Sequence, residues 1–202
     1  MNRREASKNE TRQLILNAAR RLFAQKGMED STIRDIGREA GVSPASVVVH
    51  FKSKTALLEE ALNRDIESTL LALTASMPED LGLLDRLMHL AQGFFRLYDQ
   101  NRKLYRALIR HTIFEPAAET PNITTVSELY LRFLAGLVEE GKTRGLIRRD
   151  VDANVAAGAI FSLYLGALTL LFRRPEMTVA LVAEALAAMT DQYLKGITLS
   201  EP

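Results

Sequence analysis

The chain has 202 residues, room for one large or two small domains with a sizeable core, and its 47% hydrophobic content excludes a disordered chain. It has no cysteine, which excludes disulfides and thiolate metal sites. The net charge is only +1, but residues 1–54 hold 11 Lys and Arg against 6 Asp and Glu. A surface that binds nucleic acid requires such an excess of positive charge, although an ordinary solvated surface can also have it.

The N-terminal segment MNRREASKNETR is charged and has no apolar stretch behind it. We therefore expect a flexible basic arm here rather than a secretory signal. From Thr11 to Lys26, apolar residues recur on one face at helical spacing and Gly27 supplies a stop, which predicts the first helix. The apolar face consists of Ile15, Ala18, Ala19, Leu22 and Phe23.

The segment TIRDIGREAGVSPASVVVHF predicts two short helices joined by a tight turn. Thr32 can cap the first helix with Asp35 as its reciprocal partner, and Gly41 stands where that helix must end. Ser43 then caps a second helix, which has a proline at its first position. This pattern is a helix-turn-helix, which is typical of proteins that bind the DNA major groove.

Three blocks in order, within residues 11–62, carry a family resemblance: TRQLILNAARRLFAQKG, STIRDIGREAGVS and HFKSKTALL. They closely resemble the N-terminal domain of the tetracycline-repressor (TetR) family of transcription regulators. The resemblance implies an all-α chain with a three-helix DNA-binding domain at residues 1–52. A helical ligand-binding and dimerisation domain would then occupy residues 53–202. It also implies a cytoplasmic protein that binds double-stranded DNA.

Site residues follow from the resemblance, position by position. Base reading is expected from Pro44, Ala45, Ser46, Val48 and Val49. Phosphate contacts are expected from Thr32, His50 and Lys54, aided by Arg12 and the basic arm. The family usually has Gly at the position of Ala45 and Tyr at that of Val48. Val48 has no hydrogen-bond donor, but it can pack on a thymine methyl group.

Helical periodicity continues to the C-terminus, and no stretch predicts a strand. A long helix is expected from about Lys54 to Ser76. Further helices are expected at 83–98, 103–114, 124–143, 153–173 and 177–195, which makes about nine in all.

The segment Ala153–Phe172 is uncharged and about as long as a membrane span. Hydropathy alone therefore allows a membrane-associated helical protein. We favour a helix buried on nearly all sides, because a cytosolic DNA-binding protein explains the rest of the chain better.

The last two helices are too apolar for the surface of a monomer, which indicates an interface. In the family these helices pair with their copies, so the resemblance implies a homodimer through them. The alternative is that both faces are internal core. The first helix has a stripe of Ala153, Ala157, Ile160, Tyr164 and Leu168. The second has Val179, Val182, Ala183, Leu186, Ala187 and Met189.

Aromatic and methionine side chains recur in the C-terminal part at helical spacing. An ordinary core explains them, but a cavity inside a helical bundle is a common ligand site. The family uses this domain to bind small effectors, mostly apolar or amphipathic ones. The candidate ligand-binding residues are Met88, Phe94, Tyr98, Arg110, His111, Tyr130, Phe133, Phe161 and Thr169.

The sequence has no convergent set of catalytic groups. Apart from His50, the chain has two histidines, His89 and His111, which lie on separate predicted helices without the spacing of metal ligands. The sequence also has no glycine-rich phosphate loop and no nucleophile elbow. We therefore expect no enzyme activity, no metal and no cofactor.

These observations predict a dimeric repressor that a small apolar or amphipathic effector releases from a palindromic operator. The alternatives are an activator or an effector-independent DNA binder and, from another class, the membrane-associated protein.

Overall fold

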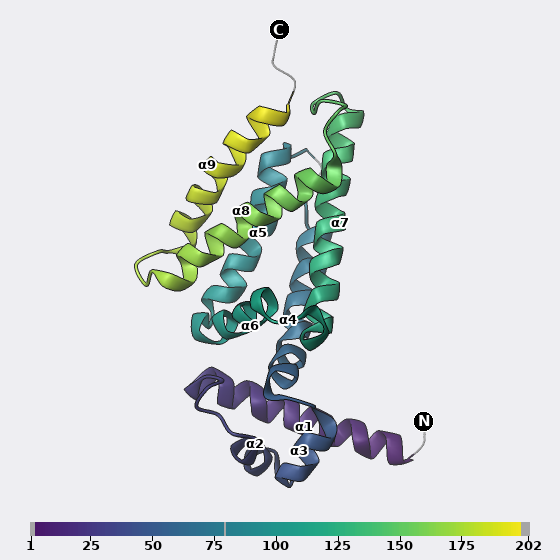
Figure 1. Ribbon diagram of the computed structural model, residues 1–202, viewed down its shortest axis with the longest axis vertical. Helices are drawn as coiled ribbons and strands as arrows, with labels where there is room; N and C mark the ends of the chain where they lie inside the picture. The colour runs from purple at the N-terminus through teal and green to yellow at the C-terminus, as the bar shows by residue number, and fades with distance from the viewer. Residues whose placement is uncertain (1–2, 79, 199–202) are drawn as a thin grey trace. The chain divides into compact units, whose positions relative to one another are not determined.

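Figure 1 shows the computed structural model, which describes residues 3–78 and 80–198. Within these ranges the regular structure consists of nine α-helices and one short 3-10 helix, η1 (Ala117–Glu119). The same ranges also contain an isolated antiparallel bridge between Ile147 and Thr198. The prediction of an all-α fold with about nine helices is confirmed.

The helices lie close to the positions that the periodicity predicts. They are α1 (Arg3–Lys26), α2 (Ile33–Ala40), α3 (Pro44–His50), α4 (Lys54–Ala75), α5 (Leu83–Asp99), α6 (Arg102–Phe114), α7 (Pro121–Thr143), α8 (Ala153–Arg173) and α9 (Val179–Ile197). The start of α7 differs from the prediction, because Pro121 occupies the first helical position, where a proline is favoured.

The N-terminal segment is helical from Arg3, so the prediction of a flexible arm is wrong for the described residues. Six of residues 3–10 are Arg, Glu, Ala or Lys, which are strong helix formers, and no Gly or Pro precedes Gly27. As a result α1 runs for 24 residues. Met1 and Asn2 lie outside the described residues.

The chain folds as two compact units. The first combines Met1–Asp65 with Asn101–Thr124, and the second combines Ile66–Gln100 with Thr125–Pro202. The predicted domains at residues 1–52 and 53–202 divide the chain by function, and that division stays a prediction.

In the first unit, α1 packs against α2, and α2 packs against α3 (Figure 1). All five residues of the predicted apolar face of α1 are buried. The start of α6 joins this unit: the Asn101 side chain donates to the Ala24 carbonyl at 3.3 Å, and Lys103 Nζ donates to the Lys26 carbonyl at 2.8 Å. These bonds satisfy carbonyls that the end of α1 leaves without partners inside the helix.

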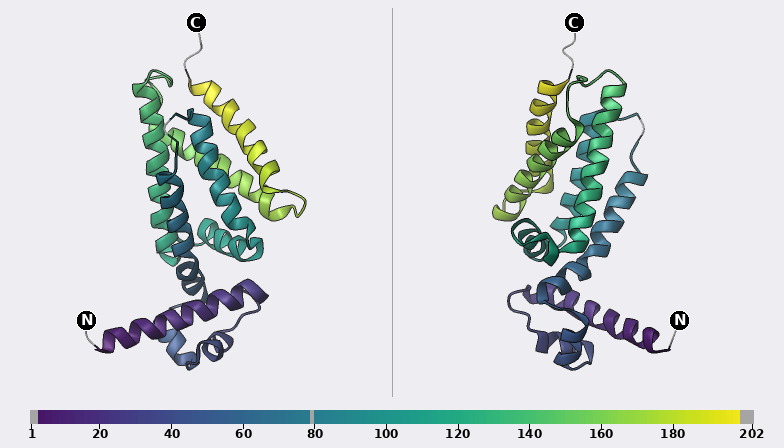
Figure 2. Two further views of the ribbon diagram at one scale, coloured as in Figure 1. Left: turned by 180° about the vertical axis from the view of Figure 1, so that it is seen from behind. Right: turned by 45° about the vertical axis from the view of Figure 1, so that its right-hand side comes forward.

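In the second unit, α9 packs along both α5 and α8; Figure 2 shows these helices from two further directions. Many of the residues predicted to form a dimer face lie in the core of this unit. Every residue of the α8 stripe, from Ala153 to Leu168, is buried, as are Val182, Ala183 and Leu186 of α9. The prediction that these residues form the dimer face is therefore wrong. Both helices are apolar on more than one face, so the apolar pattern alone does not tell the core face from an exposed face.

Among the described helices, α8 alone is long and apolar enough to cross a membrane, with a mean hydropathy of 2.0 over its most apolar stretch. Core helices of soluble proteins meet the same criterion. The α8 stripe packs inside the second unit, which supports the explanation as a core helix. Only 39% of the apolar stretch is buried, however, so the prediction of a helix buried on nearly all sides is wrong: one face of α8 packs in the core and the other, also apolar, is left exposed.

Candidate DNA-binding site

A capping box fixes the start of α2. The Thr32 hydroxyl accepts a hydrogen bond from the Asp35 N–H at 3.1 Å, and the Asp35 carboxylate accepts one from the Thr32 N–H at 3.2 Å. The Thr32 hydroxyl also donates to this carboxylate at 2.8 Å. These bonds with Thr32, together with Lys26 nearby, hold the pKa of Asp35 below its usual value. The predicted cap is confirmed.

Two glycines shape the turn between α2 and α3. Gly41 has a φ of +71°, in the left-handed region that favours glycine, and its N–H donates to the Arg38 carbonyl at 3.3 Å. Gly37 lies where α2 passes against the turn, and a Cβ there would come within 2.9 Å of the Val42 carbonyl oxygen. The sequence predicts the role of Gly41, whereas the role of Gly37 depends on a close approach that only the structure shows.

The recognition helix α3 is stabilised at its own N-terminus. The Ser43 hydroxyl accepts a hydrogen bond from the Ser46 N–H at 3.1 Å, and Pro44 occupies the first helical position. Val47 is fully buried, and Phe51, which ends the helix, is also in the core. These contacts fix which face of α3 turns outward.

Four of the five predicted base-reading residues share that outward face. Pro44, Ala45, Val48 and Val49 are all exposed and follow the i, i+3, i+4 spacing of one helix face. Ser46, the fifth, is half-buried. The structure thus places these residues together on a short helix, and their contacts with bases stay a prediction.

Three of the four predicted phosphate contacts lie at helix ends. Thr32 precedes α2, His50 ends α3, and Lys54 begins α4. Lys54 Nζ donates to the carbonyls of Glu29 and Ser31 at 3.4 and 3.2 Å. His50 has Nδ1 buried without a hydrogen-bond partner among the described residues.

Arg12, the fourth predicted phosphate contact, is bonded inside the first unit. Its guanidinium forms a bidentate salt bridge with the Glu60 carboxylate of α4, in which Nε donates a hydrogen bond at 2.8 Å. A third N–H donates to the His50 carbonyl at 2.9 Å, and the guanidinium carbon lies 4.4 Å from the centroid of the Phe51 ring. The sequence alone gives no sign of Glu60 as a partner, because the two residues lie 48 positions apart.

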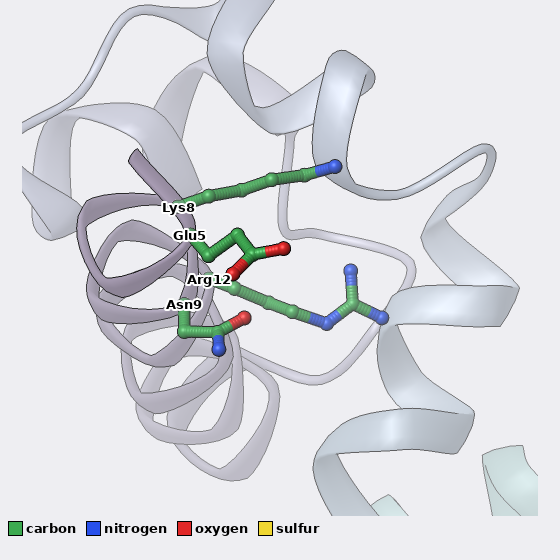
Figure 3. Close-up of a pocket in the computed structure, with 4 residues that line it drawn as sticks. All are labelled: Glu5, Lys8, Asn9 and Arg12. Carbon is green, nitrogen blue, oxygen red and sulfur yellow. The ribbon is translucent and has the colours of Figure 1, made fainter. Parts of the chain in front are cut away.

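An open recess of about 440 Å³ lies beside Arg12 on α1. Figure 3 shows its lining side chains, with Lys8 and Arg12 extending in the same direction and the Glu5 carboxylate between them; Asn9 completes the lining. The lining is polar and carries charges of both signs, so the recess is no apolar ligand pocket.

Two further exposed cations belong to this region. Arg34 on α2 and Lys52 between α3 and α4 are both exposed. Arg38 is also exposed, but it pairs with Asp35 at 2.8 Å. Arg34 and Lys52 were absent from the predicted set, although helical spacing from the buried Ile36 puts Arg34 on the outer face of α2.

The predicted ligand-binding residues do not form one set. Arg110 and His111 belong to the first unit, where Arg110 pairs with Glu29 at 2.5 Å and lowers its pKa. The others belong to the second unit, where Thr169 is exposed and its hydroxyl donates to the Gly166 carbonyl. Met88 is buried, and Phe133 is half-buried.

Four of the predicted ligand residues join a continuous cluster of rings in the second unit. Neighbouring ring centroids lie 5.5 to 6.1 Å apart. Burial raises the pKa of Tyr98 to about 12, and it raises the pKa of Tyr130 and Tyr164 as well, so all three stay neutral at physiological pH. The cluster consists of Phe94, Phe95, Tyr98, Tyr130, Phe161, Tyr164 and Phe172.

Within the described residues, no three His, Asp or Glu side chains gather in a way that could hold a metal ion. His89 lies half-buried with Nε2 at 3.1 Å from the Leu73 carbonyl, and His111 has Nε2 buried without a partner in the described ranges.

Comparison with known proteins agrees with the geometry. The sequence signature of the bacterial regulatory proteins, tetR family, matches residues 15–61. Nucleoid occlusion factor SlmA of Haemophilus influenzae is 30% identical over 160 residues, which cover 78% of this chain and 73% of SlmA. HTH-type transcriptional repressor BepR of Brucella suis is 26% identical over 175 residues, 83% of each protein.

A solved structure shows the same fold. Thermus thermophilus FadR, a TetR family transcriptional repressor in complex with lauroyl-CoA, has a TM-score of 0.76 and 17% identity. The match covers 95% of this chain and 97% of FadR. From the signature over the helix-turn-helix, the relatives along most of its length and the shared fold, the chain belongs to the TetR family of bacterial regulatory proteins.

Proposed function

We propose that this protein is a cytoplasmic transcriptional repressor that binds a palindromic DNA operator as a homodimer and leaves it when a small apolar or amphipathic effector binds. The observation that carries the proposal is the exposed face of α3, presented behind a capped turn in the basic part of the chain. A helix in this setting enters the major groove, and two copies on a two-fold axis read two half-sites.

The relatives support repression as the mode of regulation. BepR is named a transcriptional repressor, and so is the FadR of the same fold. FadR holds lauroyl-CoA, which is amphipathic, the class of effector that the apolar second unit of this chain favours. An effector would stabilise a conformer whose recognition helices no longer match successive major grooves, with a coupling free energy of about 1–3 kcal/mol.

Selection of bound duplexes from a random DNA pool tests the DNA half of the proposal. We expect the selected sites to be palindromic, and log K should fall by about 0.9 per phosphate contact for each tenfold increase in salt. Affinity that is insensitive to salt, or a preference for single asymmetric sites, would contradict the proposal.

A ligand panel that includes lauroyl-CoA tests the effector half. A ligand that binds only the folded state increases the free energy of unfolding by about 2.7 kcal/mol at a hundredfold excess over Kd, and the melting temperature rises as a result. Linkage requires the same ligand to weaken operator binding. Stabilisation without operator release would leave a ligand site that does not regulate DNA binding.

A second candidate is a DNA-binding protein that needs no effector. The close packing of the aromatic cluster favours it, since the rings contact one another. The SlmA relative is named for nucleoid occlusion rather than for regulation by a ligand. A panel that gives neither stabilisation nor release would support this candidate.

A further inference from the structure

We infer that Val48 and Val49 select the operator by packing against thymine methyl groups in the major groove. This inference rests on the proposed DNA binding, and it adds the chemistry by which the recognition helix chooses its sequence.

The core of the first unit explains neither valine. Val47 and Phe51 make the inward contacts of α3 and are 0% and 4% exposed, whereas Val48 and Val49 are 57% and 80% exposed. Valine is also a weaker helix former than alanine, because its branched side chain is restricted against the preceding turn. Two adjacent exposed valines on a helix of seven residues therefore indicate an apolar partner outside the chain.

The outward face of α3 carries carbon alone. Pro44, Ala45, Val48 and Val49 have no side-chain donor or acceptor, and the polar residues of the helix, Ser46 and His50, are half-buried. In the major groove each base pair shows hydrogen-bonding groups, and the C5 methyl of thymine is the apolar group among them. The chemistry of this face therefore matches thymine.

The size and stiffness of the side chains suit a close approach. Valine has one strongly preferred rotamer in a helix, so its methyl groups are ordered before DNA binds. Ala45 is short and leaves room for the helix to come near the base edges. The exposed cations Arg34 and Lys52 lie before and after α3 in the chain, where contacts to phosphates would position the helix without reading sequence.

The test replaces thymines of the selected operator one at a time with deoxyuridine. Deoxyuridine presents the same hydrogen-bonding edge as thymidine and lacks only the C5 methyl. Affinity is measured with the full-length protein by fluorescence anisotropy at one fixed salt concentration. At one or two positions in each half-site, we expect the substitution to weaken binding by about fourfold, the effect of losing one buried apolar carbon.

Two variants assign the effect to the valines. Val48→Ala and Val49→Ala should fold, because both positions are exposed and alanine is the better helix former. Each variant should weaken binding to the thymine operator and remove the thymine–deoxyuridine difference at one position, as a double-mutant cycle requires of groups in contact. Leu14→Ala is the control: Leu14 is 48% exposed on α1, and its removal should leave the full difference in place.

The outcomes separate this inference from the proposed function. A protein that binds its operator specifically but tolerates deoxyuridine at every position would overturn the inference alone. If deoxyuridine weakened binding by the same factor in both alanine variants as in the wild type, another group would contact the thymine methyl. That result would also overturn the inference. A protein that selects no duplex from the pool would instead refute the proposed DNA binding.

Discussion

At the scale of single residues, Arg12 connects three elements of the first unit. It joins α1 to the Glu60 carboxylate of α4 and to the last carbonyl of the recognition helix at His50, and it covers the Phe51 ring. A paired guanidinium that also satisfies a helix-terminal carbonyl holds those parts in one geometry. This arrangement suggests that Arg12 affects DNA binding by positioning α3.

Removing this group should therefore weaken binding to all duplexes alike. We expect Arg12→Gln to lower the free energy of unfolding by about 1–2 kcal/mol, the range for a charged hydrogen-bonded pair that is partly exposed. The slope of log K against log salt should stay the same, whereas loss of a direct phosphate contact would reduce it by about 0.9. Glu60→Gln is the matched variant, and it should also lower the free energy of unfolding and weaken DNA binding without changing the slope. If Glu60→Gln left DNA affinity unchanged while Arg12→Gln reduced the slope, Arg12 would be a phosphate contact as first predicted.

Glu59 of α4, the neighbour of Glu60, has a carboxylate that is only 1% exposed and bonds to the start of α7. It accepts hydrogen bonds from the Ile123 N–H at 2.9 Å and from the Asn122 side chain at 3.3 Å. These bonds satisfy an N–H that the first turn of α7 leaves without a helical partner. Burial nevertheless raises the pKa of Glu59 above its usual value of 4.5, and the hydrogen bonds oppose that rise only in part.

A raised pKa makes stability depend on pH in a predictable direction. The folded protein holds the Glu59 proton more tightly than the unfolded chain does. The resulting contribution to the free energy of unfolding is therefore complete below pH 4.5, and it is lost as pH rises through the folded-state pKa. Glu59→Gln stays neutral and can keep the bond from Ile123, so its free energy of unfolding should lack this decline. Denaturant unfolding from pH 4 to 7 measures both proteins. Glu59→Ala, which loses the bond, should be less stable than Glu59→Gln throughout; identical pH profiles for wild type and Glu59→Gln would contradict the argument.

At the scale of helices, the sequence predicts starts and stops well because they depend on local chemistry. The Thr32 and Ser43 caps and the stop at Gly41 each act within a few residues, and all appear in the structure. Contacts over long distances could not be predicted. Examples are the attachment of Asn101 to the end of α1 and the inward face of α8, which composition cannot distinguish from its outward face.

The fit between α2 and the turn that follows it depends on Gly37. An exchange of Gly for Ala inside a helix normally stabilises it by about 1 kcal/mol. At Gly37 the added Cβ would meet backbone atoms, at 2.9 Å from the Val42 oxygen and 3.3 Å from the Pro44 nitrogen, and these atoms cannot rotate away. We therefore expect Gly37→Ala to lower both the melting temperature and the affinity for DNA.

Gly136 in α7 provides the control for this prediction. It is also inside a helix, but a Cβ there would meet no atom within 4 Å. Gly136→Ala should therefore raise the melting temperature and leave DNA affinity as it is. If both exchanges stabilised the protein, α2 and the turn would have room to separate.

At the scale of the whole molecule, the proposed dimer needs an apolar surface that one copy leaves exposed, and α8 and α9 carry such residues. Val155, Leu181 and Met189 are 69%, 47% and 37% exposed, unlike the buried residues of the same helices. Gly166 on α8 also has open space beside its Cα, which permits another helix to approach closely. We propose that these residues, rather than the buried stripes, contact the second copy.

The double variant Leu181→Glu with Met189→Glu should therefore give a folded monomer. A charge buried in an apolar interface without a partner costs several kcal/mol, whereas the same charge on an exposed surface costs little. Light scattering measures the mass in solution, and circular dichroism measures the helix content. Fluorescence anisotropy should show weaker operator binding, because a monomer cannot bind the two half-sites together. Leu146→Glu, at an exposed position between α7 and α8, is the matched control and should remain dimeric. Leu186→Glu should unfold the second unit instead, since Leu186 is only 2% exposed within one copy. A double variant that stayed dimeric and kept its operator affinity would place the interface on another part of the surface.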